Sequence, residues 1–309
     1  FSPNGKFAYL INELSGKVIA FGYTDGKLEQ IQSIAADSLQ ARGSADIHLS
    51  PDGKFLYASN RLEGDGIAIF AVDTVNGTLT RAGYQSTGIH PRHFNITPNG
   101  KYLLTAYQTT YPGGDTESFQ QVTDRATGQV LMESNNHHYS WMPRSNRLYY
   151  TRKGMQGKEL VTIDPATQAE EVLAHNLPDG WFSFAPTEDF LLFNITEEGP
   201  KKGEDLQEIL VPDDRQPGWR TRSFIHKYDL ATGVFQRLTY GHTSTSINDI
   251  SDDGRYLLFT CSERELTKRP FSTTLLYRMD LQTLETELLL KDPFISYAQF
   301  SPCLLYTSD

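Results

Sequence analysis

The sequence predicts an all-β fold of repeated antiparallel sheets, because one short phrase recurs at nearly constant spacing and a second turn signal recurs between its copies. The phrase is clearest at Ser2-Pro-Asn-Gly-Lys6, Ser50-Pro-Asp-Gly-Lys54 and Thr97-Pro-Asn-Gly-Lys101. The equivalent positions Pro3, Pro51, Pro98, Pro143, Pro186, Asp252 and Pro302 lie 48, 47, 45, 43, 66 and 50 residues apart. This is the spacing of propeller blades, so we expect a β-propeller of six to seven four-stranded blades.

Each copy of the phrase has the chemistry of a tight hairpin turn. Proline fixes φ, the Asn or Asp side chain bonds nearby backbone, and glycine accepts a positive φ. The flanking segments 46–50 and 54–59 mix polar with apolar residues over short runs, as partly buried antiparallel strands do. The phrase therefore predicts the turn between the first two strands of a blade.

A second turn recurs out of phase with the first and predicts the connection between the last two strands of a blade. Its copies are Asp73–Gly77, Asp124–Gly128, Asp164–Gln168, Asp229–Gly233 and Asp280–Leu284. Two hairpins per period give four strands, and radially arranged sheets leave only short, protected edges. We interpret the polar stretch 196–205, within the one long interval, as a surface insertion.

Composition excludes several classes of protein. The 309 residues are 38% hydrophobic and 12% aromatic, which is enough for a sizeable core. The net charge of -10 argues against a nucleic-acid partner, and no apolar run is long enough for a membrane span. Cys261 and Cys303 are too few for a disulfide framework. The chain begins at Phe1, partway through a repeat, so the sequence does not decide whether a signal peptide precedes it.

Residues 1–106 resemble the seven-bladed lactonase family that includes the propeller-type 6-phosphogluconolactonases. The resemblance rests on the segments 9–13, 45–61 and 90–104, which are longer and more specific than a generic propeller turn. It implies hydrolysis of a sugar lactone in carbohydrate metabolism, with no cofactor.

Residues 107–302 are instead similar to the N-terminal propellers of prolyl-oligopeptidase and dipeptidyl peptidase IV-type serine peptidases, or to TolB-like propellers. The segments 141–152, 184–191, 211–220 and 226–239 carry this likeness. We therefore interpret the chain as a chimera joined near Ala106 to Thr110, between the second and third strands of a blade, with residues 303–309 as an artefactual tail. The alternative is one divergent propeller with an irregular repeat.

Lactone hydrolysis needs a base that activates water and a cation near the carbonyl oxygen. The family resemblance identifies Glu13 as the candidate general base; the alternative is a solvated glutamate at a strand end. Asp46 and His48 are two residues apart, so they share one face of their strand. His48 is the second catalytic candidate and Asp46 a substrate-binding candidate, unless the two form a purely structural pair.

Arg61 and Arg92 lie in family strings and are candidates to bind a substrate carboxylate or phosphate with two hydrogen bonds each. The alternative for both is a salt bridge between blades. Weaker candidates are Arg42, His90 and His93. In the family, an arginine sixteen residues before the glutamate contributes to the site, and the chain has no such position.

The second half offers no catalytic motif of its own. The chain contains no Gly-x-Ser-x-Gly string, so under the peptidase interpretation it is a gating or peptide-binding module. Glu197-Glu198 is similar to the acidic pair with which some such propellers hold a peptide amino terminus, but a solvated loop is the other interpretation. His137 and His138 are adjacent and would point to opposite faces of a strand, so we assign no metal. The expected binding partner is a small sugar lactone under the lactonase interpretation and a peptide under the peptidase interpretation.

The sequence does not determine the cellular compartment or the oligomeric state of the protein. A lactonase would be expected in the cytoplasm, and a peptidase propeller in the periplasm or outside the cell.

Overall fold

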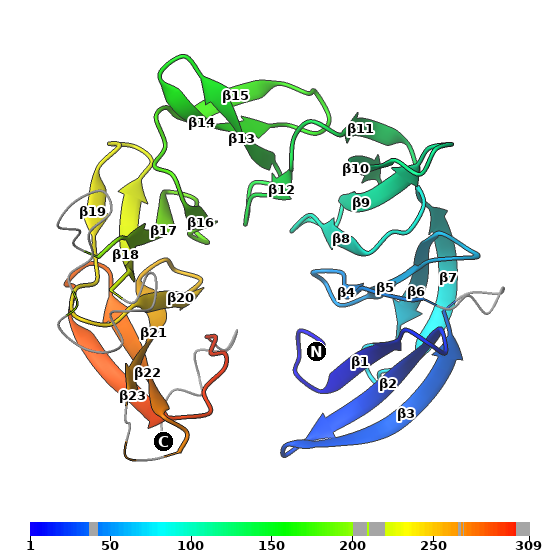
Figure 1. Ribbon diagram of the computed structural model, residues 1–309. Coiled ribbons are helices and arrows are strands. Elements are labelled where there is room, and N and C mark those ends of the chain that lie inside the picture. The colour runs from blue at the N-terminus through cyan, green and yellow to red at the C-terminus, as the bar shows by residue number, and fades with distance from the viewer. Residues whose placement is uncertain (37–42, 200–208, 210–219, 265–266, 268, 301–309) are drawn as a thin grey trace. The chain divides into compact units, whose positions relative to one another are not determined.

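The computed structural model describes residues 1–36, 43–199, 209, 220–264, 267 and 269–300, and within these it is built from β-strands (Figure 1). Six sheets follow one another along the chain. Five sheets have four strands each, as predicted for propeller blades, and the first sheet has three. No helix that could cross a bilayer occurs in these ranges.

The strands of each sheet are consecutive in sequence. The first sheet contains β1 (Phe7–Asn12), β2 (Lys17–Thr24) and β3 (Lys27–Ala35). The second contains β4 (Ile47–Leu49), β5 (Phe55–Asn60), β6 (Gly66–Val72) and β7 (Leu79–Ser86). The third contains β8 (His93–Ile96), β9 (Tyr102–Thr110), β10 (Thr116–Asp124) and β11 (Val130–Ser134).

The same order continues in the other three sheets. They contain β12 (Ser140–Trp141), β13 (Leu148–Gly154), β14 (Gly157–Ile163) and β15 (Glu170–Ala174); β16 (Trp181–Phe184), β17 (Phe190–Glu197), β18 (Arg222–Asp229) and β19 (Phe235–Arg237); and β20 (Thr245–Ile250), β21 (Tyr256–Arg264), β22 (Ser272–Asp280) and β23 (Thr286–Asp292). The chain divides into two compact units, which are Phe1–Arg152 with Leu160–Val172 and Lys153–Glu159 with Leu173–Asp309.

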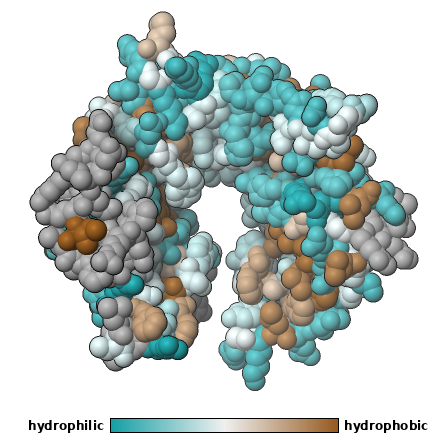
Figure 2. Space-filling view, in the orientation of Figure 1, coloured by the Kyte–Doolittle hydropathy of each residue, from teal (hydrophilic) through white to brown (hydrophobic). Residues whose placement is uncertain are grey.

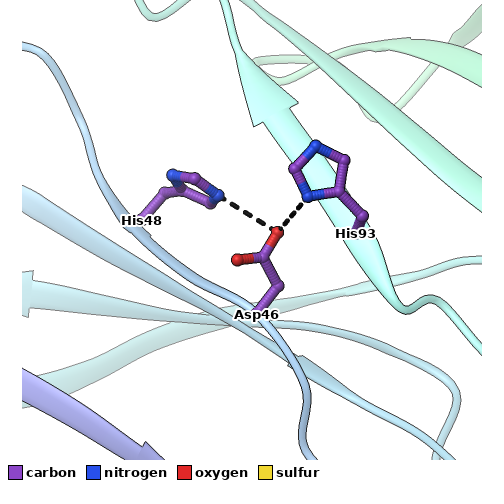
Figure 3. A group of neighbouring side chains, drawn as sticks. All are labelled: Asp46, His48 and His93. Carbon is purple, nitrogen blue, oxygen red and sulfur yellow. Dashed lines mark hydrogen bonds and ion pairs between the residues drawn. The ribbon is translucent and has the colours of Figure 1, made fainter. Parts of the chain in front are cut away.

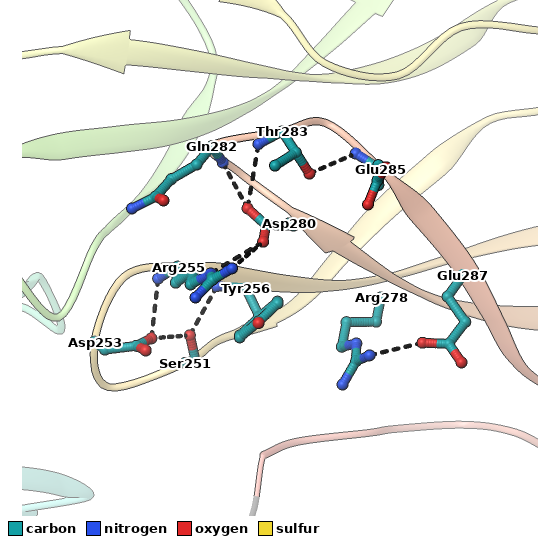
Figure 4. A network of polar contacts seen from close by, with 10 residues as sticks. All are labelled: Ser251, Asp253, Arg255, Tyr256, Arg278, Asp280, Gln282, Thr283, Glu285 and Glu287. Atoms are coloured by element: carbon teal, nitrogen blue, oxygen red, sulfur yellow. Dashed lines mark hydrogen bonds and ion pairs between the residues drawn. The ribbon is translucent and has the colours of Figure 1, made fainter.

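The recurrent phrase forms the predicted turn between the first two strands of a sheet, and a serine hydroxyl closes it. Ser50 Oγ accepts the Phe55 amide at 2.9 Å and donates to Asp52 Oδ1 at 2.6 Å. Gly53 has a φ of 67°, in the left-handed region that favours glycine. Ser251, Asp253 and Tyr256 repeat the arrangement between β20 and β21 (Figure 4). The turn is therefore specified by contacts within six residues of chain.

The second predicted turn is also present, and it forms even where glycine is missing. In the copy between β6 and β7, the Asp73 carbonyl accepts the Gly77 amide at 2.8 Å. In the last copy Leu284 takes the glycine position with a φ of 62° and donates its amide to the Asp280 carbonyl at 2.7 Å. The Asp280 carboxylate bonds the backbone of the same turn (Figure 4). The aspartate therefore determines this turn more than the glycine does.

The core of the first unit consists of layers between neighbouring sheets. One layer joins β2 to β5, β6 and β7 through Val18, Leu56, Ala68, Phe70 and Leu79, all of which are buried. On the other face of the second sheet, Tyr57, Ile67, Phe94 and Leu103 form a second layer with the third sheet. The two central strands of the second sheet, β5 and β6, therefore bury residues on both faces, whereas β7 is largely exposed.

The outer face of the first sheet keeps an exposed apolar surface. Leu10, Tyr23 and Leu28 are exposed, and the strand register places them on one face, away from the core layer. Hydrophobic residues gather over β1–β3 at the lower right of Figure 2.

Three sequence expectations about this architecture need correction. Residues 106–110 lie in the second half of β9, so the expected junction falls inside a second strand and not between strands. Thr196 and Glu197 are the last residues of β17 and do not belong to a surface insertion. His137 and His138 lie in the connection between β11 and β12, so the strand argument does not apply to them. The tail 303–309, with Cys303, lies outside the described residues, and the division at residue 106 stays a prediction.

Candidate functional site

Most of the candidate residues lie along one edge of the first three sheets. The second strand of each sheet is antiparallel to the first, so the end of β5 lies beside the start of β4. β1 comes after the Ser2–Lys6 turn phrase as β5 comes after Ser50–Lys54, so β1 is equivalent to the second strand of a four-stranded sheet. Glu13 follows β1, Arg61 follows β5, and Asp46 directly precedes β4. The strand directions therefore place the ends of second strands and the beginnings of first strands at a common edge.

Glu13 and Arg61 form an ion pair between the first and second sheets. Arg61 Nη2 donates to Glu13 Oε1 at 2.7 Å, and Arg61 Nε donates to the Gly43 carbonyl at 2.5 Å. The Arg61 side chain is only 10% exposed, whereas Glu13 is 63% exposed. The Gly43 amide in turn donates to the Glu13 carbonyl at 2.7 Å. A buried guanidinium therefore positions a carboxylate that remains open to solvent.

Asp46, His48 and His93 form a second cluster (Figure 3). Asp46 Oδ2 lies 3.1 Å from His48 Nε2 and 2.8 Å from His93 Nδ1, and it accepts the Phe94 amide at 3.1 Å. Asp46 Oδ1 accepts the Ile47 amide at 2.9 Å. The His48 ring packs edge-on against Phe94, with centroids 4.9 Å apart. One carboxylate thus joins the start of β4 to the start of β8.

The surroundings of Asp46 stabilise its charged form. Partial burial raises the pKa of Asp46, but hydrogen bonds from His48 and the Phe94 amide outweigh that effect, with smaller contributions from the charges of His48 and His93. The pKa of Asp46 is therefore below its usual value, and the group is a carboxylate at neutral pH.

A cleft of about 460 Å³ opens within the third sheet and its connections, and Arg92 lines it. His90 also lines this cleft; its amide donates to Asp65 Oδ1 at 2.8 Å, and it has a φ of 58°. The remaining lining residues are Ala106, Tyr107, Gln108, Ser118, Phe119, Gln120, Ser134, Asn135, Asn136, His137 and His138. Arginine with imidazoles and amides suits an anionic or hydroxyl-rich ligand.

The structure brings four of the sequence candidates together in two pairs. Glu13 pairs with Arg61, and the salt bridge between sheets that was the alternative for Arg61 is present. His48 pairs with Asp46, the alternative that their shared strand face allowed. Arg92 is exposed in the cleft, and Arg42 lies outside the described residues.

Two contacts of the candidate site were not found by reasoning from the sequence. His93 was only a weak candidate, although it lies five residues before Pro98 as Asp46 lies five residues before Pro51. The second is the hydrogen bond from Arg61 to the Gly43 carbonyl, a backbone group whose position no side chain in the sequence indicates.

In the second unit, Glu197 contacts Arg237 Nη1 at 2.8 Å through its Oε1. Glu197 is exposed, as the solvated interpretation expects, but it ends β17 and is bound within its own sheet, so it does not lie in a loop. An acidic receptor for a peptide amino terminus would need this carboxylate for its ligand, so the peptide-binding interpretation gains no support here.

In comparisons with known proteins, the first part of the chain matches one family. Residues 1–120 match the family model described as lactonase, 7-bladed beta-propeller. Over 112 residues the chain is 50% identical to a 6-phosphogluconolactonase of Formosa agariphila, which covers 35% of this chain and 32% of that protein. The chain spans about a third of the length of the curated relatives it matches.

Two solved structures resemble the chain over most of its length. The hydrazine synthase of Kuenenia stuttgartiensis covers 95% of this chain and 85% of its own, with a TM-score of 0.52 and 16% identity. A structure described as TolB, from Agrobacterium tumefaciens, covers 86% of this chain and 84% of its own, with a TM-score of 0.42 and 15% identity. At 16% identity, the likeness to the hydrazine synthase concerns the fold alone.

These findings place the protein in a class. The chain is an all-β protein with the β-propeller fold, as the repeat predicts. Within it, residues 1–120 are similar to the seven-bladed lactonases, and specifically to 6-phosphogluconolactonases.

Proposed function

We propose that residues 1–120 contribute a site for hydrolysis of a sugar lactone of the 6-phosphogluconolactone type, with Glu13 as general base. The observation that carries the proposal is the Glu13–Arg61 pair, in which a buried cation holds a solvent-facing carboxylate. The match of residues 1–120 to the lactonase family and the 50% identity to a 6-phosphogluconolactonase support the same chemistry.

The proton transfers of this reaction need only Glu13 and a water molecule. Among the described residues Glu13 Oε2 has no hydrogen-bond partner, so it can accept a proton from a water molecule. The resulting hydroxide adds to the lactone carbonyl, the ring C–O bond breaks, and the proton returns from Glu13 to the alkoxide that leaves. Arg61 keeps Glu13 oriented toward solvent throughout.

Recognition of a phosphorylated substrate needs a second cation. Arg92 is exposed in the cleft, and a guanidinium binds phosphate through two parallel hydrogen bonds. His90 lines the same cleft and adds a hydrogen-bonding group. We assign the phosphate of the substrate to this cleft.

The proposal is tested by following hydrolysis of 6-phosphogluconolactone against its spontaneous rate. The whole chain should accelerate the reaction, and Glu13→Gln should lower that acceleration by about 10²–10⁴-fold, the range of general-base catalysis. Glutamine keeps an oxygen for the Arg61 hydrogen bond, so the substitution removes the base and the charge opposite Arg61 but keeps the shape of the side chain. Glu29→Gln, an exposed glutamate in β3, is the matched control and should change the rate less than about twofold, as a surface substitution.

Two outcomes would overturn the proposal in different ways. A chain that gives only the spontaneous rate would refute the lactonase function. An accelerated rate that Glu13→Gln leaves unchanged would refute the assignment of the base.

A further inference from the structure

Asp46, His48 and His93 have the composition of a metal site. A carboxylate with two imidazoles is a ligand set found at catalytic zinc and at non-haem iron centres, where further coordination positions stay open. In the described part of the chain, these are the three residues whose ligand atoms all lie within 4.8 Å of one another. We propose that they bind one divalent transition-metal ion of the zinc class.

The distances between ligand atoms suit a single ion. Ligand atoms lie about 2.0–2.2 Å from zinc, which places neighbouring ligand atoms roughly 3.0–3.5 Å apart. Asp46 Oδ2 is 3.1 Å from His48 Nε2 and 2.8 Å from His93 Nδ1. The two nitrogens are within 4.8 Å of each other, and the His93 side chain is 65% exposed, so a small ring rotation closes the set.

The backbone orients the carboxylate as an outer shell does at metal sites. Asp46 Oδ1 accepts the Ile47 amide and Oδ2 accepts the Phe94 amide. Such partners fix the direction of a ligating carboxylate and are a regular part of metal sites. The edge-on contact with Phe94 holds the His48 ring in the same way. Two of the three ligands are therefore preorganised, and the third comes from the adjacent sheet.

The charge of the cluster also favours a cation. Asp46 supplies the one carboxylate of the cluster, and a carboxylate attracts a cation by its charge. Without an ion, both imidazoles have to donate a proton to the same carboxylate oxygen. An ion replaces both protons and contacts all three ligands. His48 and His93 are 37% and 65% exposed, which leaves solvent access to the remaining coordination positions.

Equilibrium dialysis tests the site without any assay of activity. The whole chain, without a histidine tag and stripped by a chelator, is dialysed against Zn²⁺, and bound zinc is counted by mass spectrometry. We expect one zinc per chain, and a cobalt-loaded sample should absorb in the visible region. His93→Gln and Asp46→Asn should each weaken binding by more than the roughly 10–100-fold expected for loss of an outer-shell partner.

The control is His138→Gln, an exposed histidine outside the cluster, which should bind zinc like the unaltered chain. Circular dichroism verifies that each variant is folded, which is expected for His93 because its side chain is exposed. Absence of stoichiometric zinc from the unaltered chain, or zinc binding that neither His93→Gln nor Asp46→Asn weakens, would overturn the proposal. Zinc binding does not depend on lactone hydrolysis, so either proposal can fail alone.

Discussion

Asp52 should stabilise the turn between β4 and β5, and its removal tests how the recurrent phrase folds. The Asp52 carboxylate accepts the Ser50 hydroxyl at 2.6 Å and the Lys54 amide at 3.1 Å. Ser50 is almost fully buried, so its hydroxyl cannot turn to water when the carboxylate is lost. Asn4 holds the equivalent position in the first copy with the same two contacts, at 2.6 and 3.1 Å.

The magnitude follows from these contacts. A hydrogen bond to a charged acceptor contributes about 1.5–3 kcal/mol, but the Asp52 side chain is 52% exposed and solvent screens part of this. The freed Lys54 amide can bind water. Asp52→Ala should therefore lower the free energy of unfolding by about 1–2 kcal/mol. Asp52→Asn should lower it by about 0.5 kcal/mol or less, because an amide oxygen keeps both contacts.

The effect should also depend on pH. Hydrogen bonds from Ser50 and the Lys54 amide lower the pKa of Asp52 below its usual value. The stability due to the carboxylate is then fully present above about pH 4 and is lost as pH falls through the pKa of the folded state. The difference in stability between the unaltered chain and Asp52→Asn, which does not titrate, should shrink over the same range.

Urea denaturation followed by circular dichroism measures the global effect, and hydrogen exchange at the Phe55 amide measures it locally. Exchange at Phe55 should accelerate about 5–30-fold in Asp52→Ala, the factor that corresponds to 1–2 kcal/mol. Asp115→Ala, another exposed turn aspartate, is the control and should have little effect. If Asp52→Asn proves as destabilising as Asp52→Ala, or Asp52→Ala leaves Phe55 protection unchanged, the carboxylate does not hold this turn.

Two further predictions concern strain and substrate recognition. Leu284→Gly should raise the free energy of unfolding by up to about 1 kcal/mol in thermal denaturation, because Leu284 has a φ of 62° and glycine relieves the strain. Leu284→Ala keeps the Cβ atom and should not stabilise; equal stabilisation by both would exclude strain as the cause. Arg92→Gln should raise KM for 6-phosphogluconolactone roughly 10–100-fold and leave KM for the unphosphorylated lactone unchanged, since the lost contact is to phosphate. An equal change for both lactones would contradict the assignment of Arg92.

The strands could be predicted from the sequence because the signals that bound them are local. Ser50, Asp52 and Phe55 specify their turn through contacts within six residues, and Asp280 does the same for a turn that lacks glycine. The end of β9 could not be predicted in this way, since β9 continues through the expected junction by pairing with β10 along its full length. That pairing depends on residues further along the chain.

The candidate site was less predictable because its contacts join one repeat to the next. Glu13 and Arg61 are 48 residues apart, and Asp46 and His93 are 47 apart. Local patterns relate only Asp46 to His48, and this pairing was expected. The Gly43 carbonyl is set by backbone position, which no side chain in the sequence indicates.

The spacing of the repeat nevertheless contains the missing signal. Glu13 lies ten residues after Pro3, and Arg61 lies ten residues after Pro51. Residues at the same position of successive repeats occupy the same place in adjacent sheets, so such pairs face each other across the space between two sheets. Gln108, ten residues after Pro98, continues the series and lines the cleft that contains Arg92. Chemistry in this fold therefore has to be sought among residues one period apart, and the Glu13–Arg61 and Asp46–His93 contacts are the two instances that the candidate residues provide.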